Sequence, residues 1–246
     1  MSGGEASRAE VAVVAVAELF RGDGDTLVSP MGLIPSLGAK LARLTFAPDL
    51  LLSDGEALLV TADGEVEGWQ PFRKMLELIV PHGRRHVLMG ANQIDRYGNQ
   101  NISAIGDHAK PAKQLLGVRG APGNTVNHRT SYWVPRHSRR VFVESVDVVS
   151  GVGYDNAAKV GYSARRFHDV YRVVTNLGVF DFATPDNRMR LLSAHPGVTV
   201  EQIRDATSFD VDTEGAGTSR EPTADELRLI REVLDPEALR EKEVPS

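Results

Sequence analysis

The chain of 246 residues contains no cysteine, so disulfide bonds, thiolate zinc sites and cysteine nucleophiles are all excluded. It also lacks a long hydrophobic run near its N-terminus. The apolar stretch within residues 11–20 is too short to cross a bilayer, and acidic Glu5 and Glu10 stand where a signal peptide would carry basic residues. We therefore expect a cytoplasmic protein that does not associate with membranes.

An excess of positive charge is missing too, because 28 Lys and Arg residues face 33 Asp and Glu residues. The net charge of −5 argues against a broadly basic surface that binds nucleic acid. No G-x-x-x-x-G-K-[ST] phosphate loop or G-x-S-x-G turn occurs, and Asn156 replaces the third glycine of a dinucleotide fingerprint. His82 and His86 have the spacing of helical metal ligands, but Pro81 and Gly83 interrupt that helix, so we expect no metal site.

What is present is the composition of a globular protein, with 41% hydrophobic and 25% charged residues. In the first half, helical and strand patterns alternate, which is typical of α/β folds with an open, mostly parallel sheet flanked by helices. The expected helices cover residues 11–20, 32–46 and 71–80, and the expected strands cover residues 26–29, 49–55 and 85–90. Functional groups of such folds lie in loops at the carboxyl ends of the strands.

The second half is richer in β-branched and aromatic residues, which predicts adjacent, partly antiparallel strands over residues 139–149 and 171–183. Residues 151–163 between them read as a mobile loop. Thr199 with Gln202 and Thr223 with Glu226 match capping boxes, which predicts two short helices. We expect one α/β domain over residues 1–212, followed by a linker and a helical appendage over residues 213–246.

The most distinctive run is GANQIDRYGNQN at residues 90–101, directly after an apolar strand. Its Asp and Asn side chains and Gly98 are sufficient for a tight structural turn. The run also resembles the G-A-x-Q-x-D-x-x-G-N-x-N signature of class I coenzyme A transferase β subunits, and residues 29–52 resemble the segment that precedes the active-site loop in that family. The resemblance implies a coenzyme A transferase β-subunit fold and makes Asn92 and Gln93 candidate substrate-binding residues.

A second loop, GVRGAPGN at residues 117–124, resembles the glycine-rich loop whose amides receive the thioester carbonyl oxygen in that family. Backbone amides converge on a developing oxyanion only where no Cβ blocks the approach. The resemblance makes Gly120, Gly123 and Asn124 candidate substrate-binding residues. From the residues alone, an ordinary turn before a helix is an equal alternative.

The segment LLSDGEA at residues 51–57 departs from the family, whose nucleophilic glutamate stands in an E-x-G turn. Asp54 precedes the glycine here and Glu56 follows it, so these two carboxylates are the candidate catalytic residues of this chain. Asp54 is one methylene shorter than glutamate, and a displacement of about 1 Å costs on the order of a hundredfold in a positioned reaction.

The succession of motifs most closely resembles the branch of the family that hydrolytically opens a carbocyclic ring of a steroid-derived cyclohexenone acyl-CoA in cholesterol catabolism. That resemblance implies an essential glutamate on an α subunit, an αβ pair that doubles to α2β2, and no cofactor, because CoA is part of the substrate. Two alternatives stay open: a true CoA transferase that uses Asp54 or Glu56 covalently, and a non-catalytic subunit that stabilises an α partner.

Overall fold

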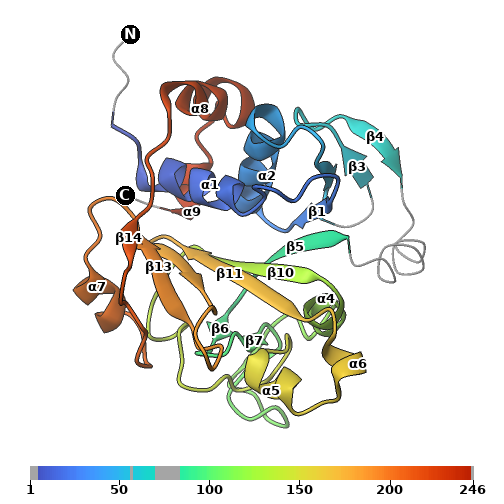
Figure 1. The fold of residues 1–246 in the computed structure, drawn as a ribbon, viewed down its shortest axis with the longest axis vertical. Coiled ribbons are helices and arrows are strands. Elements are labelled where there is room, and N and C mark those ends of the chain that lie inside the picture. Colours follow the sequence, from blue (N-terminus) through green and yellow to red (C-terminus); the bar gives the residue numbers. More distant parts are fainter. Residues whose placement is uncertain (1–4, 56–57, 70–83, 245–246) are drawn as a thin grey trace. The chain divides into compact units, whose positions relative to one another are not determined.

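The computed structural model describes residues 5–55, 58–69 and 84–244, which belong to two compact units (Figure 1). The first unit comprises residues 1–89 and 218–246, and the second comprises residues 90–217. This division differs from the expected one, which separated residues 213–246 from all that precedes them. The reason is that the C-terminal helices pack on the N-terminal helix through buried ion pairs.

Two helices dominate the first unit: α1 (Arg8–Glu18) and α2 (Leu33–Thr45). Helix α1 begins at a capping box formed by Ser7 and Glu10, which the sequence analysis did not single out. The two helices pack tightly because Gly38 has no side chain, and a Cβ there would lie 2.4 Å from Val16 Cγ1. Both helices were predicted, including the placement of Pro35 in the first turn of α2.

The sheet of the first unit has β1 (Leu27–Pro30) in its middle, paired in parallel with β2 (Leu51–Ser53) on one side and β5 (Arg85–Gly90) on the other. Strands β3 (Leu58–Val60) and β4 (Val66–Trp69) continue it as an antiparallel hairpin beyond β2. The parallel strands were predicted and the antiparallel hairpin was not. The helix expected over residues 71–80 lies outside the described residues.

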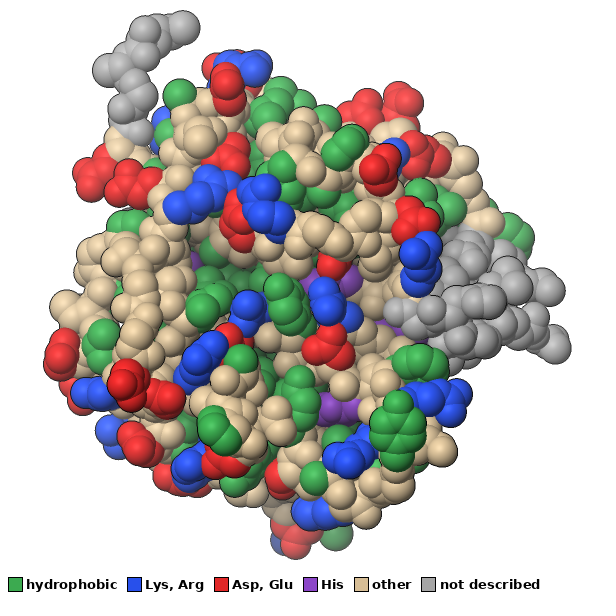
Figure 2. All heavy atoms as spheres, viewed as in Figure 1, with side chains coloured by type: hydrophobic (Ala, Val, Ile, Leu, Met, Phe, Trp, Pro, Cys, Tyr) green, Lys and Arg blue, Asp and Glu red, His purple; other side chains and the backbone are tan. Residues whose placement is uncertain are grey.

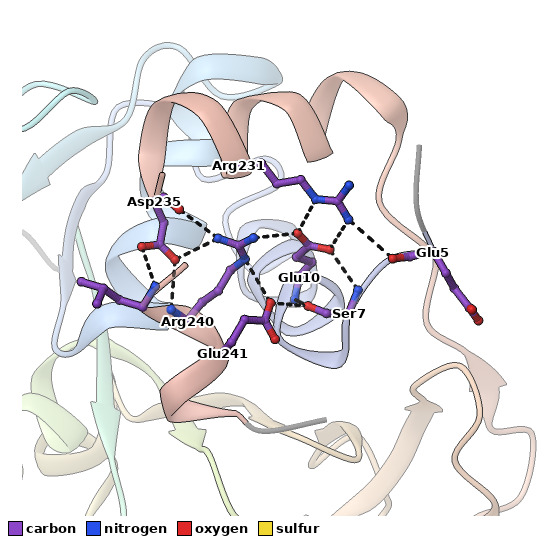
Figure 3. Close-up of polar contacts among 8 residues, drawn as sticks. Glu5, Ser7, Glu10, Arg231, Asp235, Arg240 and Glu241 are labelled. Carbon is purple, nitrogen blue, oxygen red and sulfur yellow. Dashed lines mark hydrogen bonds and ion pairs between the residues drawn. The ribbon is translucent and has the colours of Figure 1, made fainter. Parts of the chain in front are cut away.

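The C-terminal part of the first unit contains α8 (Ala224–Arg228), the π-helical segment η1 (Leu229–Leu234) and α9 (Arg240–Glu243). Figure 3 shows how this part is attached to α1: Arg231 and Arg240 both point at the carboxylate of Glu10, at 2.7 and 2.9 Å. Arg240 also pairs with Asp235 at 3.0 Å. The capping box of Thr223 and Glu226 is confirmed at the start of α8.

The second unit carries a sheet in which β10 (Arg129–Val134) is parallel to β11 (Asp169–Thr175). The strands β12 (Gly178–Asp181) and β13 (Arg190–Ala194) follow in antiparallel order. The expected α/β class, with parallel pairing and antiparallel strands in the second half, is confirmed. Strand β10 was missed.

The strand expected over residues 139–149 is wrong, because this stretch forms turns. Only a single bridge joins Phe142 to Ile94. Phe142 is buried against an aromatic cluster instead, with its ring stacked 3.7 Å from the ring of His137. The apolar residues of the stretch at 139–149 therefore pack into the core and do not form a ladder of strand hydrogen bonds.

Short elements complete the second unit. They are the hairpin of β6 (Gln93–Ile94) and β7 (Gln100–Asn101), the hairpin of β8 (Ala104–Ile105) and β9 (Lys113–Gln114), and the helices α4 (Ala121–Asn127), α5 (Tyr154–Ala158), α6 (Tyr162–Arg165) and α7 (Val200–Asp205). Strand β14 (Gly217–Thr218) lies at the boundary of the two units. The capping box of Thr199 and Gln202 is confirmed at the start of α7.

Candidate functional site

The first candidate region is the turn that follows β2 in the first unit. Asp54 is exposed there, and its Oδ1 accepts a hydrogen bond from the backbone of Leu58 at 3.1 Å. Gly55 has φ +93°, and an added Cβ would lie 3.0 Å from the carbonyl oxygen of Pro30. Only glycine fits this turn without strain. Glu56, the other candidate catalytic residue, lies outside the described residues.

Beneath this turn runs a line of buried polar side chains that the sequence analysis missed. The amide of Gly55 donates to Ser53 Oγ at 3.2 Å, Ser53 Oγ donates to Ser29 Oγ at 3.1 Å, and Arg85 Nε donates to Ser29 Oγ at 2.9 Å. Burial lowers the pKa of Arg85 to about 10. This places a buried guanidinium two serine hydroxyls away from the turn that carries Asp54. The sequence hints at this line only through a polar residue within each of the three apolar parallel strands: Ser29, Ser53 and Arg85.

The second candidate region is the motif at residues 90–101, which forms the β6–β7 hairpin. Asp95 closes the turn: its carboxylate accepts hydrogen bonds from the backbones of Tyr97 and Asn99 at 2.9 and 3.1 Å and from the Asn99 side chain at 2.9 Å. Burial raises the pKa of Asp95, although these hydrogen bonds oppose the effect. Gly98 has φ +82° and lies where a Cβ would be 2.9 Å from Phe182 Cζ. The motif is therefore a rigid, packed turn.

Gln93 and Asn92 have different surroundings within this motif. Gln93 is buried, and its Oε1 accepts from the side chain of Asn101 at 2.7 Å and the backbone of Asp147 at 3.0 Å. Its Nε2 donates to Asp147 Oδ2 at 3.0 Å. Both polar atoms of the Gln93 amide are thus engaged within the protein, while the Asn92 side chain is exposed. Of the two, Asn92 has the geometry for direct contact with a ligand.

The segment at residues 150–156 joins the two motifs of the second unit. Its Gly151 amide donates to the carbonyl of Gln100 at 3.0 Å, and its Val152 amide donates to Thr125 Oγ1 in α4 at 3.0 Å. Gly153 donates to Asn99 Oδ1 at 2.7 Å, and a Cβ at Gly153 would lie 2.5 Å from the Asn99 amide nitrogen. The first part of the stretch expected to be a mobile loop is therefore a fixed connection between the two motifs.

The glycine-rich loop leads directly into α4. Gly120 is the N-cap residue with φ −84°, and the Asn124 amide donates back to its carbonyl at 2.9 Å. Gly120 and Gly123 are both exposed, and apart from its chain neighbours and the backbone of α4 itself, no described heavy atom lies within 4 Å of the Cβ position of Gly123. Asn124 is buried, and its carbonyl accepts from Thr130 Oγ1 at 3.3 Å. Neither glycine has a positive φ or a close contact at its Cβ position, so the fold of this turn does not require glycine at either place.

Gly120, Gly123, Asn124, Asn92 and Gln93 thus all belong to the second unit, where residues 150–153 connect their two loops. Asp54 belongs to the first unit. Among the residues that the structure describes, no group of three His, Asp or Glu side chains could hold a metal ion. No helix in the described ranges is long and apolar enough to span a membrane.

Comparison with known proteins places these loops in a family. A coenzyme A transferase family model matches residues 75–206, more than half of the chain and both loops of the second unit. The cholesterol ring-cleaving hydrolase IpdB subunit of Rhodococcus jostii is 57% identical, over 98% of this chain and 97% of that protein. A 3-oxoadipate CoA-transferase subunit of Pseudomonas knackmussii is 31% identical, over 80% of this chain and 82% of that protein.

Solved structures agree with this assignment. The crystal structure of IpdAB from Rhodococcus jostii contains a chain that superimposes with a TM-score of 0.92 and 55% identity, covering 98% of this chain and all of that one. The expected family, its β-subunit fold and the resemblance to its ring-opening branch are thereby confirmed. The chain belongs to the coenzyme A transferase family.

Proposed function

We propose that this chain is the β-type subunit of a cholesterol ring-cleaving hydrolase that opens the ring of a steroid-derived acyl-CoA by hydrolytic carbon–carbon cleavage. The observation that carries the proposal is identity over nearly the full length. The chain is 57% identical to the Rhodococcus jostii subunit with that activity in its name and 31% identical to a subunit of a transferase. The sequence also departs from the transferases at the nucleophile: Asp54–Gly55 stands where they carry an E-x-G turn.

The geometry of that turn supports hydrolysis over covalent transfer. Oδ1 of Asp54 already accepts the Leu58 amide, which ties the short carboxylate to its own hairpin. A nucleophile must lie close to the thioester carbon and point at it. The Asp54 carboxylate is one methylene shorter than that of glutamate and is held by the Leu58 amide, so it reaches this geometry poorly. In this proposal the essential carboxylate and the attacking water lie with an α partner.

The loops of the second unit then position the substrate. Amides at Gly120 and Gly123 approach the thioester carbonyl oxygen, and a donor aimed at a developing oxyanion contributes roughly 3 kcal/mol in acyl chemistry. Asn124 is buried behind this loop, and Asn92 is exposed in the same unit, where its side chain can contact the substrate. The chain needs no cofactor, since the CoA group enters as part of the substrate, and it works in the cytoplasm.

The α partner is part of the proposal, because the IpdB relative is a named subunit and its crystal structure is that of IpdAB. The test is co-expression of this chain with its candidate α subunit. The purified complex is then assayed against ring-bearing steroid acyl-CoAs and against short-chain acyl-CoA and acid pairs. Ring opening with incorporation of one water supports the hydrolase, and CoA exchange between acids without ring opening would establish the transferase instead.

A further inference from the structure

A line of buried polar side chains lies beneath the Asp54–Gly55 turn, and the packing of the sheet does not account for it. Ser29, Ser53 and Arg85 are 0%, 5% and 3% exposed. Strands that are buried in a parallel sheet are usually apolar throughout. Figure 2 shows Lys and Arg side chains on the surface beside Asp and Glu side chains, where water and these partners stabilise the charge. A guanidinium held inside the sheet costs folding free energy that an apolar side chain would not.

The line leads to the carboxyl end of the strands. Arg85 is level with Leu27 in the pairing of β5 with β1, but its Nε donates at 2.9 Å to Ser29, which is two residues nearer that end. From Ser29 the line continues to Ser53 Oγ at 3.1 Å, and Ser53 Oγ accepts the Gly55 amide at 3.2 Å. Open α/β sheets carry their functional groups at this end. The buried charge therefore supports a turn that stands where the transferases carry their nucleophile.

The turn is also fixed from two other directions. Oδ1 of Asp54 accepts the Leu58 amide at 3.1 Å, and the Asp54 amide donates to the Leu58 carbonyl at 2.9 Å. Gly55 has φ +93°, and the carbonyl oxygen of Pro30 lies 3.0 Å from where a Cβ of residue 55 would be. The Leu58 bond occupies one of about four acceptor positions of the carboxylate. Asp54 is thus an exposed carboxylate with a fixed direction.

A carboxylate that stands slightly back from the reacting carbon has a different chemistry from one that touches it. The glutamate of the transferases attacks the thioester itself, whereas Asp54 is one methylene shorter. Glycoside hydrolases show the consequence: a carboxylate close to the reacting carbon is a nucleophile, and one that leaves room for a water acts through that water. In a hydrolase, an aspartate at this position is therefore suited to accept a hydrogen bond from the attacking water.

We propose that Asp54 holds the attacking water of the hydrolytic ring opening and that Arg85 is a positioning residue, which fixes the Asp54 turn through Ser29 and Ser53. This inference rests on the proposed function. The hydrogen bond orients the water for attack and contributes in the transition state, so its loss should lower kcat and leave KM unchanged.

The step requires no covalent bond to this chain. One hydrogen of the water is held by Asp54, and the other is transferred as a proton to the carboxylate of the α partner. The water oxygen bonds to the ring carbonyl carbon, the ring carbon–carbon bond breaks, and its electron pair goes to the neighbouring carbon, which takes up that proton. Asp54 neither bonds to the substrate nor changes its own protonation state.

The first experiment measures ring opening by this chain co-purified with its α partner. Asp54→Asn should lower kcat roughly tenfold to a hundredfold at unchanged KM, because one charge-assisted hydrogen bond in the transition state is lost. Asp54→Glu should lose at least as much, since the longer side chain occupies the place of the water. Full ring opening by either variant would refute the role of Asp54.

The second experiment tests the buried line. Ser53→Ala should lower kcat about tenfold, and Arg85→Lys should retain more activity than Arg85→Met, because an ammonium can still donate to Ser29. In the Asp54→Asn background, Ser53→Ala should have no further effect on kcat, whereas effects of a merely structural role would multiply. Multiplying effects would therefore contradict the positioning role.

The matched control is Thr26→Val at the opposite end of β1. Thr26 Oγ1 donates to the carbonyl of Asp23 at 2.6 Å, so this variant also removes one hydroxyl bond from the first unit and should keep full kcat. Each variant is first checked for complex formation by gel filtration, and Ser53→Ala decides if Arg85→Met does not assemble. An unmodified complex that opens no steroid ring would overturn the proposed function, whereas an active complex whose kcat is indifferent to Asp54 and Ser53 would overturn only this inference.

Discussion

The most buried arginine that links the C-terminal helices to α1 is Arg240, and its replacement by methionine tests this structure most directly. Arg240 bridges two carboxylates, Glu10 at 2.9 Å and Asp235 at 3.0 Å, and the side chains of all three residues are at most 6% exposed. Figure 3 shows the arginine inserted between the carboxylates, with Arg231 on the far side of Glu10. Methionine preserves the length of the apolar stem and removes the charge and the side-chain hydrogen bonds, while the Arg240 backbone amide can still donate to Asp235.

Removing one partner of a buried ion pair typically costs about 3–5 kcal/mol, because the remaining charge is left buried without compensation. Glu10 keeps its pair with Arg231, so we take the lower end, about 3 kcal/mol. In a chain of this size, each kcal/mol lost from the free energy of unfolding lowers Tm by roughly 2–4 °C, so Tm should fall by about 6–12 °C. Thermal unfolding of the chain co-purified with its α partner measures this shift.

The matched control is Arg228→Met, since Arg228 is 56% exposed in α8 and lies 3.9 Å from Asp225, which is 89% exposed. That change should shift Tm by less than about 2 °C, because exposed pairs contribute little. If Arg240→Met shifted Tm no more than Arg228→Met, the network would not hold the C-terminal helices in place, and the argument from burial would be wrong.

The same network gives a pH dependence. Burial alone would raise the pKa of Glu10, but hydrogen bonds from Arg231, the Ser7 amide and Arg240 outweigh it and hold the pKa below the usual value of 4.5. A carboxylate with a depressed folded-state pKa binds fewer protons in the folded state than in the unfolded state. Its stabilisation is therefore fully present above pH 4.5 and is lost as the pH falls through the lower, folded-state pKa. The Glu10→Gln variant should lose that part of the acid dependence.

Further predictions concern the site and the core. Gly123→Ala should lower turnover about a hundredfold at an unchanged Tm, because its Cβ contacts no residue outside its own helix but obstructs the approach of a thioester, whereas Gly98→Ala should fail to fold. Full turnover in folded Gly123→Ala would make the loop a simple helix start. Intact mass should show no CoA ester on Asp54 or Glu56 during turnover, and a CoA-sized increase would revive covalent transfer. Burial lowers the pKa of His137 to about 3, so below pH 6.5 the unfolded state binds more protons than the folded state. The free energy of unfolding should therefore fall below pH 6.5, by up to about 1.4 kcal/mol per pH unit. Urea midpoints measured against pH should lack this slope in His137→Phe. The chain should form a stable complex with an α subunit on light scattering and show no turnover alone, and an active monomer would contradict this.

Local rules read from the sequence were reliable where one segment contains its own determinant. The capping boxes at Thr199 and Thr223 formed as predicted, because donor and acceptor lie three residues apart on the same chain segment. Helix α2 likewise follows from its apolar spacing, with Pro35 tolerated in its first turn. The motif at residues 90–101 identified the family through the order of its residues, and its Asp and Gly chemistry predicted a tight turn, which the structure places in the β6–β7 hairpin.

Long-range partners decided the remainder. The apolar residues at 139–149 suit a strand equally well, but Phe142 finds an aromatic cluster formed by residues distant in sequence, and a ladder does not form. Long-range contacts also distinguish glycines that look equivalent in sequence. A Cβ at Gly153 would collide with the backbone of Asn99, whereas a Cβ at Gly123 would contact no residue outside its own helix.

The sequence by itself determined the family, the alternation of α1, β1, α2, β2 and β5 in the first unit, and the residues that form the two loops of the second unit. Only the tertiary structure decided that Gln93 is committed to internal hydrogen bonds, that a buried arginine lies beneath the Asp54 turn, and that residues 218–246 pack with the N-terminal helix. The physical reason is that a side chain's role depends on its burial and its partners. Partners such as Glu10 and Arg240, which are 230 residues apart, leave no signal in a local pattern.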